Sequence, residues 1–102
     1  MADVRRDAVL AGADSNEAFQ TSLKVLQETG FELWKTRPLG WFAIARRRQQ
    51  GAVLEANISV RGGGPTHVSL GLSSDNLAET VLADIAADLL RRISAHLGQE
   101  AL

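Results

Sequence analysis

The sequence predicts an α+β fold, a two-layer sandwich in which an antiparallel meander sheet of four to five strands carries two helices on one face. Two observations lead to it. Apolar residues recur at helical spacing from Leu77 to Leu97, in a stripe wide enough to cover a sheet. Val53–Arg61 and His67–Leu72 alternate apolar and polar residues, as strands with one wet face do. Both helices belong on the apolar face, and the element order is (β)-α-β-β-β-β-α.

The composition is that of an ordinary globular protein. Of 102 residues, 45% are hydrophobic and 23% are charged, which predicts a single domain over residues 1–102 with a core from about residue 7 to residue 97. The net charge of −1 and the pI near 6.1 disfavour a general attraction to nucleic acid or to anionic membranes.

The chain contains no cysteine, which excludes disulfides, thiolate metal sites and thiol nucleophiles and fits a reducing compartment. Its first residues lack the apolar core of a signal peptide, and no segment approaches the ~20 apolar residues of a membrane span. We therefore expect a cytoplasmic protein with no membrane span.

The first element is the short apolar segment Asp7–Ala11, which predicts an opening edge strand, with a frayed arm as the alternative. Residues 1–6 and 99–102 are predicted to be flexible tails. Asp14 or Ser15 then caps a helix, because Glu17 follows Asp14 by three residues and completes a capping box.

Apolar side chains mark the buried side of this first helix at Phe19, Leu23 and Leu26. Gly30 is predicted to end the helix, because it can adopt the left-handed conformation of a Schellman motif. In that motif Phe31 folds back on Leu26.

Phe31–Arg37 and Trp41–Arg47 are rich in apolar residues and flank Pro38–Gly40, where proline and glycine favour a turn. This pattern predicts a hairpin with two candidate registers. A loop of three residues pairs Arg37 with Trp41 and puts Trp34 beside Phe42 and Ile44.

A loop of four residues instead pairs Thr36 with Trp41 and puts Phe31 and Leu33 beside Phe42 and Ile44. We prefer this second register, because it gives one consistently apolar face and keeps Phe31 against the first helix. A shift of one residue reverses which side chains face the core, so the first register makes Trp34 a core residue.

The remaining strands extend the meander. Pairing Val60 with Val68 aligns the apolar residues of Val53–Arg61 and His67–Leu72 and leaves residues 62–66 as a glycine-rich loop. Pairing Ile44 with Leu54 does the same for the preceding hairpin, which turns at residues 48–50.

The closing helix over residues 77–97 is predicted to cover the core. Asn76 caps its first turn with Glu79 folding back, Arg91, Arg92 and His96 complement its negative end, and Gly98 stops it.

This order of elements, with Gly30–Leu33 opening the meander, Gly40–Ile44 in its second strand and a long closing helix, resembles the small helix-grip-like domains of bacterial envelope lipoproteins of the BamC kind. The resemblance extends from Asp7 to Leu97 and concerns order and spacing. It implies a role in protein contacts without catalysis. The chain differs from those proteins in lacking a signal peptide and a lipidated cysteine.

Few residues suggest catalysis. His67, Glu55 and Ser69 share the predicted open face, but a flat strand surface favours solvated side chains over a hydrolytic site. The glycines of residues 62–64 lack the Lys and Ser/Thr of a phosphate-binding loop. We therefore predict no enzyme activity, no catalytic residues, no metal and no cofactor.

Arg46, Arg47 and Arg48 are the one local run of positive charge. They suit contacts with phosphates, but the order of elements is not that of an RNA-recognition motif, so the sequence favours a solvated hairpin end over a nucleic-acid site.

The preferred hairpin register places both tryptophans on the sheet face away from the helices. Exposed aromatic clusters are typical of surfaces where proteins meet. We therefore predict a protein-interaction domain, most simply a homodimer, with a small apolar ligand held between the sheet and the closing helix as the alternative. The predicted interface comprises Trp34, Trp41, Ala43, Arg47, Glu55, Asn57, Arg61 and His67.

Overall fold

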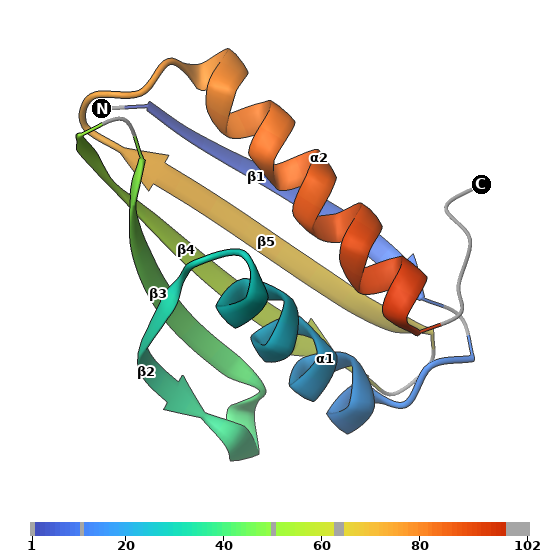
Figure 1. Cartoon of the computed structure of the whole chain (residues 1–102). Helices are drawn as coiled ribbons and strands as arrows, with labels where there is room; N and C mark the ends of the chain where they lie inside the picture. The colour runs from blue at the N-terminus through green and yellow to red at the C-terminus, as the bar shows by residue number, and fades with distance from the viewer. Residues whose placement is uncertain (1, 11, 50, 63–64, 98–102) are drawn as a thin grey trace.

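The structure, a computed structural model, describes residues 2–10, 12–49, 51–62 and 65–97. It shows the predicted α+β fold, with one antiparallel sheet and two helices in the order β-α-β-β-β-β-α (Figure 1). The elements are β1 (Ala2–Leu10), α1 (Ser15–Glu28), β2 (Glu32–Arg37), the 3-10 turn η1 (Pro38–Gly40), β3 (Phe42–Gln49), β4 (Ala52–Arg61), β5 (Thr66–Ser74) and α2 (Glu79–His96).

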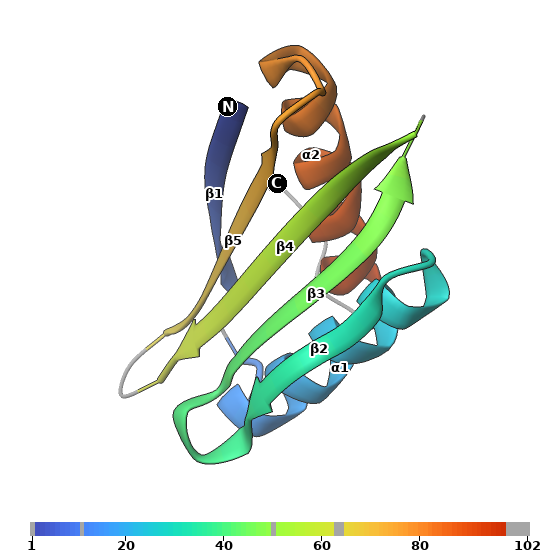
Figure 2. The same cartoon turned by 90° about the vertical axis from the view of Figure 1, so that its left-hand side faces the viewer.

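The five strands lie in the order β1-β5-β4-β3-β2, so β4 is central and β1 and β2 form the edges. Both helices cover the same face, with α2 over β1 and β5 and α1 over the other half of the sheet (Figure 1). Figure 2 looks onto the opposite face, which no described helix covers. We call this second surface the open face.

Both predicted ends of α1 are confirmed. The Asp14 carboxylate accepts a hydrogen bond from the Glu17 backbone N–H at 3.1 Å. At the other end Gly30 has a φ of 94°, and the Phe31 N–H donates to the Leu26 carbonyl at 2.9 Å. These are the bonds of a capped helix start and a Schellman end.

The first strand is longer than predicted, because β1 begins at Ala2. The prediction of a tail over residues 1–6 is therefore wrong for residues 2–6. Val4 is buried beneath α2, whereas Arg5 projects from the open face and Arg6, on the helix side, is exposed at the edge of the sheet. Met1, Ala11 and the predicted tail of residues 99–102 lie outside the described residues.

The buried stripe of α2 is confirmed at Leu82, Ala86, Leu89 and Ile93. The predicted Asn76 cap is wrong, because α2 begins at Glu79 and its N-cap residue is Ala78, without a side-chain hydrogen bond. The chain from Ser74 to Ala78 instead crosses from β5 to the helix layer and buries Leu77. The predicted stop at Gly98 lies outside the described residues.

The two strand pairings around β4 had different outcomes. Val60 pairs with Val68 as predicted. Ile44 pairs with Asn57 and not with Leu54, so the β3–β4 prediction is off by three residues. An odd shift exchanges the two faces of a strand. Ala43 and Ala45 therefore face the helices and are fully buried.

The volume of the α1 side chains explains why alanines occupy the helix-facing positions of β3. Phe19 and Leu26 project from the helix and are fully buried, as are Ala45 and Ala56 below it in the sheet. Large side chains from a helix and small ones from the sheet fill the same space without overlap. Phe42 or Ile44 on that face would compete with Phe19 for the volume.

The β2–β3 hairpin does not adopt the preferred register. Glu32 and Leu33 pair with Arg46 and Ala45, as in the first candidate register, but the pairs nearer the turn follow neither candidate. Arg37 pairs with Phe42 across the turn, whereas Leu33 pairs with Ala45, so Trp34 is an extra residue that forms a β-bulge. The positive φ of the turn, 48°, belongs to Trp41 and not to Gly40. Bulge and turn together orient β2 so that Leu33 packs on the core while Trp34 does not.

Substitutions can test the assignment of Ala45 to the helix side and of Ile44 to the open face. We expect Ala45→Leu to lower the free energy of unfolding by about 1–3 kcal/mol, because it overpacks a closed core. Ile44→Ala, at the half-buried neighbour, should cost about 1 kcal/mol, less than a fully buried isoleucine does. Chemical denaturation measures both, and a larger loss for Ile44→Ala would contradict the assignment.

Candidate functional site

Apolar side chains collect on one half of the open face. Phe42 and Ile44 project there from β3, because their neighbours Ala43 and Ala45 face the helices. Trp34 joins them from the bulge in β2, with 60% of its surface exposed. We call Trp34, Phe42 and Ile44 the open-face cluster. Val53 on β4, 50% exposed, lies on the same face.

Charged residues frame this cluster. The Arg46 guanidinium lies over the Trp34 ring, 4.0 Å from its centre, and is 3.7 Å from the Glu55 carboxylate. Such exposed contacts contribute little to stability. They place a positive charge on one face of the indole ring, and Trp34 remains largely exposed.

Five of the predicted interface residues lie on the open face. They are Trp34, Glu55, Asn57, Arg61 and His67, and their side follows from the strand pairing and the alternating burial of β4 and β5. Whether they contact a partner stays a prediction.

The other three, Trp41, Ala43 and Arg47, lie on the helix side, so their predicted placement is wrong. The cause is the β3–β4 register, which reverses the two faces of β3. Trp41 packs against the rim of the core, and a Cβ added to Gly62 would lie 3.7 Å from its ring.

Sequence reasoning missed Phe42, Ile44 and Arg46. A signal for them was present: Ala43 and Ala45 alternate with these larger residues, and α1 carries a phenylalanine that needs room. Counting apolar residues on each face favoured the other side of β3. The volume that the side chains of α1 leave above the sheet favours the observed arrangement, in which the alanines of β3 face the helix.

Beyond this cluster the open face is formed by β5, with small side chains, and by the edge strand β1, with Asp3, Arg5, Asp7 and Val9. On β5 it presents Ser69, Gly71 and Ser73. The Asn57 side chain lies over Gly71, since a Cβ added there would come within 2.8 Å of its Oδ1. The open face thus combines a bulky apolar half over β2–β3 with a low polar strip over β5 and charged side chains on β1.

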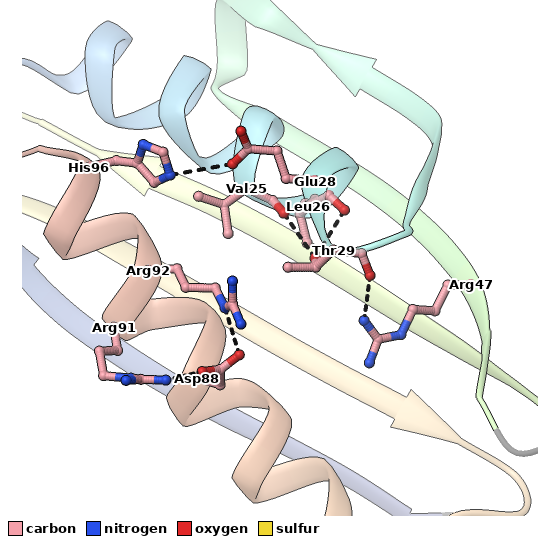
Figure 3. Close-up of polar contacts among 9 residues, drawn as sticks. All are labelled: Val25, Leu26, Glu28, Thr29, Arg47, Asp88, Arg91, Arg92 and His96. Carbon is pink, nitrogen blue, oxygen red and sulfur yellow. Dashed lines mark hydrogen bonds and ion pairs between the residues drawn. The ribbon is translucent and has the colours of Figure 1, made fainter.

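A second candidate site lies between the two helices, around Arg47 (Figure 3). Its Nη1 donates to the Thr29 carbonyl at 2.6 Å, and its guanidinium lies 4.7 Å from the centre of the Phe31 ring. Burial lowers the pKa of Arg47, while the Asp88 carboxylate acts in the opposite direction. The arginine therefore holds the negative C-terminal end of α1.

Asp88 lies across this gap on α2 and accepts hydrogen bonds from Arg92, at 2.7 Å, and from Arg91. These bonds, that of Arg92 first, lower the pKa of Asp88. The groove between the helices has a volume of about 430 Å³. Its walls carry the charged residues Glu28, Arg47, Asp84, Asp88 and Arg92. At the solvent side His96 Nε2 of α2 lies 3.3 Å from the Glu28 carboxylate of α1, a contact that joins the two helices.

The three arginines of the basic run do not form one flat patch. Arg46 faces the open side and Arg47 the helix side, and with Arg48 they line a hollow of about 400 Å³ at the end of β3. The hollow also contains Glu32, which lowers its positive charge.

The residues considered for hydrolysis are not brought together. Glu55 pairs with Ser73, six residues along β5 from His67, which is roughly 20 Å at the rise of a strand. The Ser69 hydroxyl donates to Asp7. Within the described ranges, no three His, Asp or Glu side chains gather as metal ligands. No described helix is long and apolar enough to cross a membrane.

A scan against models of protein families found no match, and a search of curated proteins found none similar to this chain. The resemblance to BamC-like domains therefore stays a prediction, and function has to be argued from the geometry.

The ion pairs of Asp88 predict a pH dependence of stability. Because its pKa is lower in the folded state than in the unfolded chain, about 3.9, its stabilising effect is complete above that value and disappears as the pH falls through the folded pKa. Asp88→Asn should therefore be less stable than wild type at pH 5–7, and the difference should shrink below about pH 4. Denaturation midpoints across this range test it, and a constant difference would contradict it.

Proposed function

We propose that this protein is a non-enzymatic interaction domain that associates with a second copy of itself through the open face. The observation that supports this most is the open-face cluster, since Trp34, Phe42 and Ile44 gather on a sheet surface that no described helix covers. Clustered exposed aromatics are uncommon on monomers and enriched where proteins meet.

The pattern of the open face is self-complementary, which favours a second copy as the partner. Ile44 and Phe42 lie at equal distances on either side of the row that contains Ala43 and Ile58. A twofold axis along this row places Ile44 of one copy over Phe42 of the other. In a twofold contact each such pair occurs twice.

The same axis also matches charges. Glu55 and Arg61 lie at equal distances from Ile58 on β4, three residues to either side. Glu55 of one copy therefore faces Arg61 of the other, again twice. Opposite charges at matched positions favour one orientation of the partner over its alternatives.

The available area suits a dimer. Five strands about 4.8 Å apart, each contributing roughly seven residues at 3.3 Å, give a projected area of about 550 Å². The accessible surface over the side chains is larger than its projection, and standard interfaces bury about 800 Å² per partner. Two sheets packed face to face form a sandwich about 10 Å thick.

The alternative of a small apolar ligand has less support. Between the sheet and α2, where such a ligand would be held, Leu82, Leu89 and Ile93 are themselves buried in the core. The neighbouring groove between the two helices is lined mostly by charged side chains, whereas sites for apolar ligands are lined mostly by hydrophobic ones.

Self-association can be tested at the cluster. We expect Ile44→Lys to raise the dimer Kd by about tenfold or more, because it places a charge in the centre of the contact. Ala87→Lys, which adds the same charge at an exposed position of α2, is the matched control and should leave Kd unchanged. Sedimentation equilibrium measures Kd, with circular dichroism to show that each variant is folded.

Charge exchange tests the orientation. Glu55→Arg alone should weaken the dimer, because the introduced guanidinium would face Arg61 of the other copy, and the double variant Glu55→Arg with Arg61→Glu should restore it. A wild-type protein that is monomeric at millimolar concentration, or an Ile44→Lys variant with unchanged Kd, would refute the proposal.

A further inference from the structure

The strand β1 has one free edge along its whole length. It pairs residue by residue with β5 over all nine positions, without a bulge. On its other side no described strand lies next to it, and Figure 2 shows it at the end of the sheet opposite to β2. A long regular edge without proline or glycine is a template for pairing with another strand.

We propose that β1 pairs antiparallel with β1 of a second copy, which joins two sheets into one of ten strands. This contact goes beyond the open-face contact, because it uses the edge of the sheet and not its face. Main-chain hydrogen bonds provide the attraction, and side chains on the two strands select the register.

The sequence of β1 favours one register. Residues that oppose each other must project from the same side of the sheet. The register that pairs all nine residues places Ala2 opposite Leu10. In that register Arg5 faces Asp7 of the other copy, and Val4 faces Ala8, each pair occurring twice. Cross-strand pairs of opposite charge and of apolar side chains stabilise a sheet.

The neighbouring registers are worse. A shift by two residues in either direction leaves two of the nine residues of each strand overhanging. One of these shifts opposes Asp7 to Asp7, and the other opposes Arg5 to Arg5. The register of greatest length is thus also the register in which the charges match.

Arg6 limits the strength of this contact. It lies on the twofold axis and meets Arg6 of the other copy, and like charges directly opposite each other are destabilising. In the single chain its Nη1 donates to the Arg5 carbonyl at 2.9 Å, a local bond that occupies a main-chain acceptor of β1. Arg6 therefore protects the edge against unlimited pairing, which is how charged residues act on edge strands.

Cross-linking gives a direct test, because the chain contains no cysteine of its own. At the twofold axis the two Cα atoms of residue 6 are about 4.5–5.5 Å apart, within reach of a disulfide. Arg6→Cys should therefore form a covalent dimer under mild oxidation. The matched control is Ala8→Cys on the same side of β1, whose copies are separated by about 14 Å along the strand and should not cross-link.

Both cysteine variants are made with and without Ile44→Lys, so that the two contacts can be distinguished. Cross-linking of Arg6→Cys that persists with Ile44→Lys supports the edge contact, whether or not the open-face contact exists. Cross-linking that disappears with Ile44→Lys would show that only the open-face contact brings the chains together. Equal cross-linking of Arg6→Cys and Ala8→Cys would indicate random collision and would overturn the edge proposal.

Charge variants test the register by sedimentation in the Ile44→Lys background. Arg5→Glu should raise the Kd of the edge dimer by about tenfold or more, and the double variant Arg5→Glu with Asp7→Arg should restore it. Arg6→Thr, which removes the repulsion at the axis, should lower Kd by up to about fivefold. An Arg6→Thr variant that weakens the dimer would place the axis elsewhere and overturn this register.

Discussion

The packing of α1 on the alanines of β3 and β4 is the constraint on which the rest of the structure depends. Phe19 and Leu26 fill space between helix and sheet, which favours small side chains at neighbouring positions of β3 and β4. Ala43, Ala45 and Ala56 meet this requirement. Close packing leaves little freedom in which side of β3 faces α1. A few additional methylenes in a closed core lower the free energy of unfolding by as much as many surface contacts raise it.

This one choice determines both candidate sites. With Ala43 and Ala45 facing the helices, alternation sends Phe42 and Ile44 to the open face and Arg47 to the helix side. The arginine is then partly buried, and it is stabilised by the Thr29 carbonyl at the end of α1 and by the Phe31 ring. The apolar surface and the charged groove are thus two consequences of the same register.

The proposed contacts arise from the limits of a two-layer fold. The two described helices cover one face of the five-stranded sheet. The other face and the two edge strands have no such cover within the described chain and are open to solvent or to a partner. On the face, the chain places aromatic side chains beside matched charges. On the β1 edge it places Arg5, Arg6 and Asp7. In the proposed edge contact, Arg5 and Asp7 would attract a second copy and Arg6 would repel it. The strength of the proposed contacts would depend on charge, whereas the packing beneath α1 depends on apolar side chains.

The sequence by itself determined the types and order of the elements, the start of α1 at Asp14 or Ser15, the Schellman end at Gly30 and the β4–β5 pairing. These features depend on neighbouring residues or on a hairpin whose two strands alternate clearly, so local patterns are sufficient. Five of the eight predicted interface residues lie on the open face for the same reason, because four of them belong to β4 and β5. Only the tertiary structure decided the side of β3, the bulge at Trp34 and the full length of β1. On β3 both sides carry apolar residues, and the choice between them depends on the volume of α1, which is distant in sequence. On β1 the polar residues Arg5 and Arg6 interrupt the apolar pattern of a strand. The strand forms nevertheless, because β5 and α2 lie beside it.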